Sequence, residues 1–199
     1  ITEYDDVMKK HFIDSLSIVK VIDLSNLSDN NKMIDIGTGA GFPGLVLKIA
    51  FPDLELTLLD SLNKRVLFLN TIVDRLRLSG IHNIHGRAED YARSEAMREK
   101  YDFAVSRAVS NLSTLSEYCL PFIKLGGKFI SYKSEKITEE TEKAQKAISV
   151  LGGSLEEQSD FILPNSEIYR NLCVIKKVKN TPDQYPRKAG LPGKKPIVW

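Results

Sequence analysis

The stretch Asp35-Ile36-Gly37-Thr38-Gly39-Ala40-Gly41-Phe42-Pro43-Gly44 decides the fold, because it joins an apolar run that predicts a strand to a longer one that predicts a helix. Glycines in such a loop permit a tight turn and let a ligand approach the backbone. Pro43 suits the first turn of the helix that follows. The spacing Gly39-x-Gly41-x-x-Gly44 also fits the dinucleotide fingerprint. The loop therefore predicts a nucleotide-like ligand without identifying it.

Outward from this loop, strand-like and helix-like segments alternate along the chain. Period-2 or continuous apolar runs predict strands, and longer runs of period 3.6 predict helices. The expected strands are 32–37, 55–60, 83–86, 102–107, 128–133, 153–163 and 169–178. The expected helices, after helical turns in 4–25, are 43–51, 63–78, 91–100, 112–125 and 138–151. This order predicts a doubly wound, mostly parallel seven-stranded α/β sheet that ends in an antiparallel hairpin.

Length and composition limit the class of protein. A chain of 199 residues with 42% hydrophobic residues suffices for one sizeable core. No run approaches the roughly 18–20 apolar residues of a membrane helix, and the N-terminal residues lack the pattern of a signal peptide. Cys119 and Cys173 lie far apart in apolar surroundings, which favours reduced core thiols over a disulfide or a metal site. We therefore expect a soluble, cytosolic protein without a metal.

The charge is unevenly distributed along the chain. Residues 170–199 hold eight Lys or Arg and one acid, Asp183, a balance of +7, so the other residues carry −5 of the net +2. The spaced prolines and glycines of 180–199 predict an extended arm that tracks phosphates. The alternatives are a solvated, idle tail and a tail packed on the body through Tyr185 and Trp199. Tyr185 and Trp199 are candidates for stacking on a base. We expect an N-terminal helical segment (1–30), a ligand-binding domain (31–179) and this basic tail (180–199).

Two nucleoside ligands suit the glycine loop. S-adenosylmethionine carries a sulfonium and an amino group, and Asp35 is a potential anionic neighbour that would repel a pyrophosphate. Asp60 ends the second strand, where its two oxygens can accept both ribose hydroxyls of either ligand. A dinucleotide domain would continue into a second mononucleotide half where this chain has a hairpin, so the methyl donor is favoured. Asp35 could instead cap a neighbouring turn.

The loops after the third and fourth strands narrow the chemistry. The backbone amides of Ala88 and Glu89 could contact an adenine edge, although an ordinary helix start explains the same residues. The loop that contains Ser106 and Arg107 lacks the Asn/Asp-Pro-Pro-aromatic motif for an exocyclic amine. It also lacks a cysteine that could attack a pyrimidine ring, because Cys119 lies in a predicted helix.

These motifs together resemble one family. Taken together, they resemble the bacterial 16S rRNA guanine-N7 methyltransferase family RsmG, also called GidB. The segments that carry the resemblance are 35–44, Asp60-Ser61, Lys64-Arg65, Gly86-Arg87-Ala88-Glu89, Ser106-Arg107-Ala108 and the tail residues 185–196. The likeness covers nearly the whole chain, and its most specific parts are the tail and residues 11–16. It implies a Rossmann-like class I methyltransferase that uses S-adenosylmethionine to methylate guanine N7 in 16S rRNA or the 30S subunit, in the cytoplasm and as a monomer.

Two features depart from the family pattern. Family members begin with further helical sequence before the region that matches Ile1, so we expect the N-terminal segment to be incomplete. Ser134 stands where family members often have a glycine after the lysine matching Lys133. Two other functions stay open, namely a methyltransferase for protein or small molecules and a nucleotide-binding module without catalysis.

The resemblance and the loop positions together give the candidate site residues. Those for the cofactor are Asp35, Gly37, Gly39, Gly41, Phe42, Asp60, Ser61, Ala88, Glu89 and Arg107. Those for RNA are His11, Lys133, Arg187, Lys188, Lys194 and Lys195. His11 could also be structural, and Asp14 could cap a helix.

Arg107 is the candidate catalytic residue. Guanine N7 has a free lone pair and loses no proton, so catalysis can consist mostly of positioning. A fixed cation would repel the sulfonium, so we expect Arg107 to contact an anion, either the cofactor carboxylate or an RNA phosphate. An ordinary surface arginine is the alternative.

Overall fold

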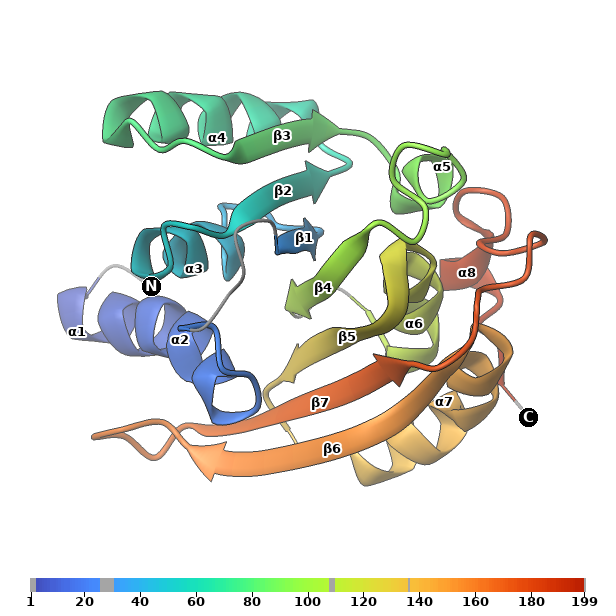
Figure 1. The fold of residues 1–199 in the computed structure, drawn as a ribbon. Coiled ribbons are helices and arrows are strands. Elements are labelled where there is room, and N and C mark those ends of the chain that lie inside the picture. Colours follow the sequence, from blue (N-terminus) through green and yellow to red (C-terminus); the bar gives the residue numbers. More distant parts are fainter. Residues whose placement is uncertain (1–2, 26–30, 108–109, 136, 199) are drawn as a thin grey trace.

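The computed structural model describes residues 3–25, 31–107, 110–135 and 137–198, which fold around one seven-stranded sheet (Figure 1). The strand order is β3-β2-β1-β4-β5-β7-β6, with β7 antiparallel to both neighbours and the other pairs parallel. The strands are β1 (Lys32–Ile36), β2 (Glu55–Asp60), β3 (Ile81–His85), β4 (Tyr101–Arg107), β5 (Ile123–Lys133), β6 (Gly153–Ile162) and β7 (Tyr169–Lys177). The predicted doubly wound sheet with a C-terminal antiparallel hairpin is confirmed.

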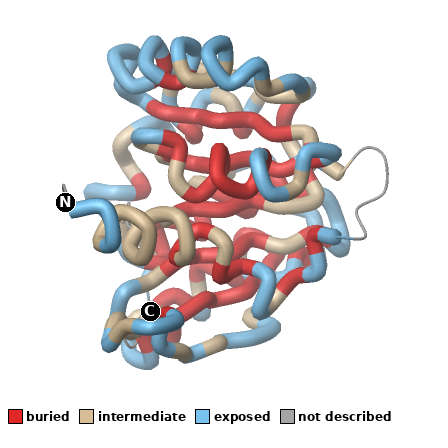
Figure 2. The backbone as a smooth tube through the Cα atoms, turned by 90° about the vertical axis from the view of Figure 1, so that its left-hand side faces the viewer, coloured by how far each residue is buried: buried red, intermediate tan, exposed pale blue. Residues whose placement is uncertain are grey.

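Helices cover both faces of this sheet. The larger ones are α3 (Gly44–Ala50), α4 (Asn63–Leu76), α6 (Leu112–Cys119) and α7 (Thr138–Val150). The short ones are α1 (Tyr4–Val7), α2 (Asp14–Leu16), α5 (Ala88–Tyr91) and α8 (Leu191–Lys194), with a π-helical turn at Met8–Ile13 and 3₁₀ turns at Ser17–Lys20 and Leu120–Phe122. Figure 2 shows buried residues along the strands and exposed ones along the outer sides of the helices.

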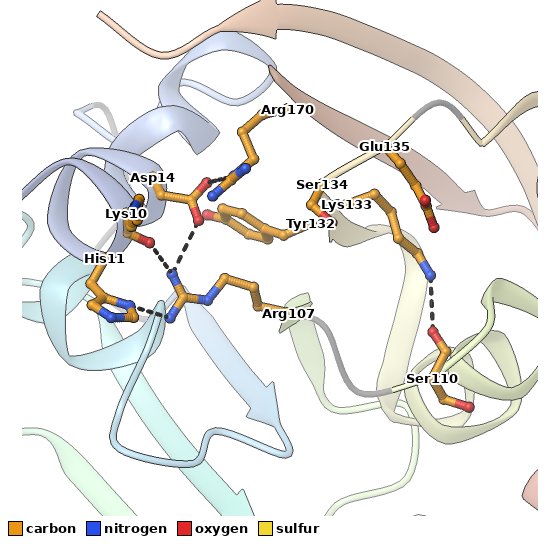
Figure 3. Close-up of a pocket in the computed structure, with 10 residues that line it drawn as sticks. All are labelled: Lys10, His11, Asp14, Arg107, Ser110, Tyr132, Lys133, Ser134, Glu135 and Arg170. Carbon is orange, nitrogen blue, oxygen red and sulfur yellow. Dashed lines mark hydrogen bonds and ion pairs between the residues drawn. The ribbon is translucent and has the colours of Figure 1, made fainter. Parts of the chain in front are cut away.

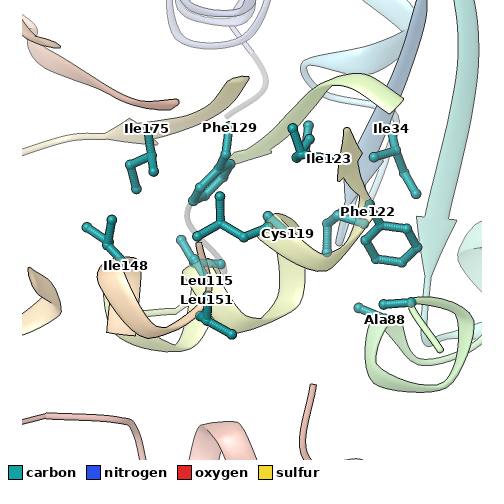
Figure 4. Packing of buried hydrophobic residues seen from close by; sticks show 14 of the residues in the cluster. Ile34, Ala88, Leu115, Cys119, Phe122, Ile123, Phe129, Ile148, Leu151 and Ile175 are labelled. Atoms are coloured by element: carbon teal, nitrogen blue, oxygen red, sulfur yellow. The ribbon is translucent and has the colours of Figure 1, made fainter. Parts of the chain in front are cut away.

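Alternate strand positions supply two separate hydrophobic clusters, as the period of two in a strand requires. Met33 and Leu58 belong to the cluster that packs against α3, α4 and the N-terminal segment. Ile34 and Leu59 belong to the cluster on the other face, with α5, α6 and α7. Figure 4 shows Cys119 of α6 within this second cluster. Cys119 is fully buried, so it is a core residue, as expected from the sequence, and this burial raises the pKa of its thiol.

The expected helix at 91–100 is wrong. Helix α5 covers Ala88–Tyr91, and turns follow it. The α-helical hydrogen-bond ladder stops after Ala92, because the N–H groups of Arg93 and Ser94 donate to the carbonyls three residues back, at 3.3 and 3.1 Å. Arg98 Nη1 then donates to the Ala92 carbonyl (3.2 Å). Glu99 then takes a left-handed φ of 52°, which directs the chain into β4.

The expected helix at 112–125 is also too long. Helix α6 ends at Cys119, because Pro121 has no N–H to continue the hydrogen-bond ladder. The chain passes through the 3₁₀ turn Leu120–Phe122 and enters β5 at Ile123, five residues before the expected start at 128. The other expected boundaries lie within two residues of the observed ones.

The strand order places the site at the carboxyl ends of β1 and β4. β1 and β4 are neighbours in the sheet, with Met33 beside Phe103. The helices that follow these two strands, α3 and α6, belong to opposite faces. Loops at the carboxyl ends of β1 and β4 therefore diverge and leave a crevice, which is where ligands bind in such sheets.

Within the described residues, no helix combines the length and the apolar character needed to cross a bilayer, and no group of three or more His, Cys, Asp or Glu could hold a metal ion.

Candidate functional site

The glycine loop after β1 adopts a conformation that requires its glycines. Gly37, Gly39 and Gly41 have φ values of 72°, 62° and 95°, in the left-handed region that favours glycine. A Cβ on Gly44 would lie 2.5 Å from Leu58 Cδ2 and 2.8 Å from Asp35 Oδ2. Gly44 thus permits the close packing of α3 on the sheet.

Asp35 holds this loop from within the core. Its Oδ2 accepts hydrogen bonds from the Gly44 N–H (2.9 Å) and the Thr38 hydroxyl (2.8 Å), while Oδ1 has no partner among the described residues. Asp35 does not line the neighbouring cavities, so the structure shows the turn-capping role that was the alternative. Its contact with a cofactor stays a prediction. Burial raises the pKa of Asp35 to about 6.

The raised pKa of Asp35 predicts that the stability of the folded protein depends on pH, and that Asp35→Asn removes this dependence. The folded protein binds more protons than the unfolded chain between the ordinary pKa of 3.8 and about 6. The wild-type stability contributed by this group therefore falls as pH rises through that window and stays low above it. In Asp35→Asn, the melting temperature relative to wild type should rise by several degrees between pH 4 and pH 7 and then stay level. Thermal melts measure this, with the exposed Asp53→Asn as the control; a difference that does not change with pH would contradict the assignment.

Asp60 joins the loops after β1 and β2. Its Oδ2 accepts from the Gly39 N–H (2.9 Å) and from Arg65 Nη1 (3.2 Å), and its Oδ1 accepts from the Leu62 N–H (2.9 Å). A carboxylate has about four acceptor positions, so Asp60 keeps capacity for a ligand. The three protein donors were not expected from the sequence, because they come from loop geometry.

Two adjoining cavities lie over these loops. The glycine-loop cavity, of about 570 Å³, is lined by His11, Gly37, Thr38, Gly39, Ala40, Phe42, Asp60, Ser61, Arg65 and Arg107. The 86–89 cavity, of about 190 Å³, is lined by Ile36, Gly37, Leu59, Ser61, Gly86, Arg87, Ala88, Glu89, Ser110 and Tyr118. They share Gly37 and Ser61, so together they form one elongated site. Of the candidate cofactor residues, only Asp35 and Gly41 line neither cavity.

Ala88 and Glu89 open helix α5, as the ordinary reading of these residues expected. Their backbone N–H groups stand in the first turn, where a helix supplies no partner. The Glu89 side chain has a contact that the sequence did not indicate, because its Oε1 accepts from the Gly190 N–H at 2.7 Å.

A third cavity, the arginine cavity, of about 550 Å³, lies beside the glycine-loop cavity (Figure 3). Lys10, His11, Asp14, Arg107, Ser110, Tyr132, Lys133, Ser134, Glu135 and Arg170 line it. His11 and Arg107 line both this cavity and the glycine-loop cavity. These two side chains therefore form the wall between two ligand-sized spaces.

Arg107 pairs with the chain's own Asp14, and its expected contact with the cofactor carboxylate or an RNA phosphate stays a prediction. Arg107 Nη1 lies 3.2 Å from Asp14 Oδ2, and Arg170 Nε donates to Asp14 Oδ1 at 2.8 Å. Asp14 makes no cap contact at its helix, so the capping alternative is wrong; its buried carboxylate needs these charged partners instead. No local pattern indicates the contact with Arg170, which lies 156 residues away.

Phe42 and His11 complete this wall. The His11 ring stacks on Phe42 with centroids 5.0 Å apart, and the Arg107 guanidinium lies 5.2 Å from the Phe42 centroid. Arg107 Nη2 lies 3.3 Å from His11 Nδ1. Burial and the Arg107 charge lower the pKa of His11, which favours the neutral imidazole at physiological pH.

Lys133 reaches the arginine cavity from the end of β5. Its Nζ donates to the Ser110 carbonyl (2.9 Å) and to Glu140 Oε1 (2.7 Å). An ammonium has three donors, so one remains for a ligand. The predicted RNA contact of Lys133 is therefore geometrically available and stays a prediction.

The C-terminal residues do not form the extended arm expected from their prolines and glycines. Buried Glu117 explains this, because it accepts hydrogen bonds from the Arg187 N–H (2.7 Å) and from Arg187 Nε and Nη2 (3.0 and 2.7 Å). Arg187 is thus committed to the body of the protein. Lys188, Lys194 and Lys195 stay exposed.

The tail has two aromatic candidates for stacking on a base, Tyr185 and Trp199. Tyr185 packs against the hydrophobic cluster on the α6 side of the sheet, so its ring is not presented as a free stacking platform. Trp199 lies outside the described residues.

The sequence matches a known protein family and its members. The family model described as GidB, rRNA small subunit methyltransferase G, matches residues 1–169. The chain is 52% identical over 198 residues to the ribosomal RNA small subunit methyltransferase G of Lachnoclostridium phytofermentans, covering 100% of this chain and 81% of that protein. It is 55% identical over 197 residues to the protein of the same name from Alkaliphilus oremlandii, covering 99% and 81%.

Solved structures share the fold at low sequence identity. The M. capricolum TrmK complex with S-adenosyl-homocysteine matches with a TM-score of 0.55 and 15% identity, over 86% of this chain and 71% of that one. The geranyl diphosphate C-methyltransferase of Streptomyces coelicolor matches with a TM-score of 0.60 and 11% identity, over 78% and 76%.

Proposed function

This chain belongs to the rRNA small subunit methyltransferase G family, whose members use S-adenosylmethionine to methylate 16S rRNA, and we propose that its target atom is N7 of a guanine. One observation carries the proposal: Arg107 and His11 separate two cavities of similar size. A methyl donor in the glycine-loop cavity and a base in the arginine cavity would meet at that wall.

The residues present fit the cofactor. The glycine-loop cavity and the 86–89 cavity together have the size and elongated shape of a nucleoside with an amino-acid arm. Asp60 keeps one acceptor position for a ribose hydroxyl, and the first-turn amides of Ala88 and Glu89 would contact the adenine edge. The glycine loop would lie along the amino-acid arm, because its backbone can be approached closely.

The chemistry asks little of the side chains. When bound, the cofactor supplies an electrophilic methyl group on a sulfonium. Guanine N7 would accept that methyl group with its own lone pair as the S–CH3 bond breaks, so the positive charge would pass from sulfur to the guanine and no proton would have to leave. The pairing of Arg107 with Asp14 reduces the repulsion that a bare guanidinium would exert on the sulfonium. The contribution of this chain is to hold the donor and acceptor in line, which in favourable cases supplies roughly 7–11 kcal/mol.

The RNA side of the proposal uses the arginine cavity. Lys10, Lys133 and Arg170 add positive charge around the base position, and His11 and Phe42 present stacked rings at its edge. Exposed Lys188, Lys194 and Lys195 would contact phosphates. We also propose that the enzyme acts as a monomer in the cytoplasm, on 16S rRNA or the assembled 30S subunit.

The deciding experiment is transfer of labelled methyl from S-adenosylmethionine to 30S subunits and to naked 16S rRNA, followed by mapping of the product base. We expect N7-methylguanine at one position. Label in a ribosomal protein or a small molecule would support another acceptor class, and binding of S-adenosylmethionine without any transfer would support a non-catalytic module. A preference for NAD over S-adenosylmethionine in equilibrium binding would overturn the cofactor assignment.

The three exposed lysines of the tail predict a salt effect. Each phosphate contact contributes a slope of about −0.7 in log affinity against log salt for single-stranded RNA. Replacing Lys188, Lys194 and Lys195 with alanine should therefore flatten the slope by about 2 and weaken RNA binding. Cofactor affinity should stay unchanged. The control is alanine at the exposed Lys32, Lys124 and Lys143; equal slopes in wild type and the tail variant would show that these lysines do not contact RNA.

A further inference from the structure

The C-terminal segment, defined here as residues 181–195, lies against the helices that form one end of the cofactor site (Figure 1). Its contacts are numerous and specific. Arg98, just beyond α5, donates to the carbonyls of Thr181 and Tyr185 at 2.7 and 2.9 Å. Thr114 Oγ1 of α6 donates to the Pro192 carbonyl at 3.2 Å. The segment is therefore part of the folded body.

Two of its contacts reach residues that line the 86–89 cavity. Glu89 Oε1 accepts from the Gly190 N–H at 2.7 Å. A Cβ on Gly193 would lie 3.4 Å from the Tyr118 hydroxyl, so the segment also lies against Tyr118. Glu89 and Tyr118 both belong to the lining of that cavity. The segment thus contacts, from outside, the wall that the cofactor would contact from inside.

The strongest anchor lies next to this wall in the sequence. Glu117, whose side chain is 0% exposed, precedes Tyr118 and accepts three hydrogen bonds from Arg187 within 3.0 Å. A buried carboxylate without that partner would draw in water or reorient α6. The position of Tyr118 therefore depends on the Arg187–Glu117 pair.

We propose that the C-terminal segment is a positioning element of the cofactor site: docked through Arg187 on Glu117, it fixes Glu89 and Tyr118 and thereby sets the affinity for the adenosine half of the cofactor. Arg187 is a positioning residue, because it touches Glu117 and not the cavity. This role differs from the sequence-based expectation that the tail serves RNA alone. It rests on the proposed function only through the identity of the cofactor.

The test compares cofactor binding in Arg187→Ala with that in a variant of similar stability. Calorimetry with S-adenosylhomocysteine, well below the melting temperature, should show at least a tenfold weaker Kd for Arg187→Ala, and adenosine alone should show the same fold-change. Arg187→Lys, which keeps a cation on Glu117, should recover part of the affinity. In methyl transfer, KM for S-adenosylmethionine should rise while kcat at saturating cofactor stays near wild type.

The control is Ile148→Ala, which removes core packing in α7 and leaves the hydrogen bonds and ion pair of the segment in place. It should lower the melting temperature and leave the Kd unchanged. Arg93→Ala is the milder second variant, because the exposed Arg93 side chain donates to the Gln184 and Pro186 carbonyls of the segment. It should weaken binding in the same direction by a smaller factor, and it carries the test if Arg187→Ala does not fold. Wild-type Kd in the folded segment variants, or an equal loss in Ile148→Ala, would overturn the proposal. A wild-type chain that fails to bind S-adenosylhomocysteine would instead overturn the proposed function.

Discussion

Asp60→Ala is expected to weaken binding of S-adenosylmethionine and S-adenosylhomocysteine by roughly 100-fold. A ribose hydroxyl would lose a charged acceptor, and an unpaired polar group of this kind costs about 1–3 kcal/mol. The same change removes the acceptor of the Gly39 and Leu62 N–H groups, so the loops after β1 and β2 lose their common contact. Both effects act on the cofactor, and isothermal titration calorimetry measures their sum.

Two matched variants separate these effects. Asp60→Asn keeps one acceptor oxygen, so it should hold one of the two loops and lose only part of the affinity. Arg65→Ala removes the half-exposed partner of Asp60, which also lines the glycine-loop cavity, but it leaves both backbone contacts of Asp60 in place, so its loss of affinity should be smaller than that of Asp60→Ala. Cofactor affinity that survives in Asp60→Ala, with the fold intact by circular dichroism, would reject the ribose assignment.

The sequence predicted the part of this site that local backbone geometry determines. The glycine loop between β1 and α3 carries its own signal, because three residues there need left-handed φ values. Asp60 could be placed as well, because the end of β2 in a doubly wound sheet faces the same crevice as the end of β1. The parallel order of the strands followed from the alternation of helices and strands, which allows few other connections.

The contacts that the sequence could not predict join distant parts of the chain. Asp14 meets Arg107 and Arg170 only because the N-terminal segment, β4 and β7 converge beside the arginine cavity. The fold of the tail failed to follow from its composition for the same reason. Prolines, glycines and lysines predict an extended arm in isolation, but a buried Glu117 on α6 offers a partner that overrides that local preference.

Arg107→Ala is expected to lower kcat for RNA methylation by roughly 100-fold or more, because a reacting group displaced by about 1 Å can cost that much. The guanidinium joins the N-terminal segment to β4 through Asp14, the Lys10 carbonyl and His11. Without it, the wall between the glycine-loop cavity and the arginine cavity loses its common donor. Asp14 keeps Arg170, so the fold should survive with a lower melting temperature.

The cofactor affinity of Arg107→Ala shows which anion Arg107 contacts in the complex. We expect the Kd values of S-adenosylmethionine and S-adenosylhomocysteine to change less than threefold, because the guanidinium already pairs with Asp14. A parallel loss of affinity for both would assign Arg107 to the cofactor carboxylate, which both molecules carry. Arg107→Lys keeps the charge but not the fork that contacts Asp14 and His11 together, so it should remain impaired. If lysine restores the full rate, charge alone is needed and the wall geometry is not.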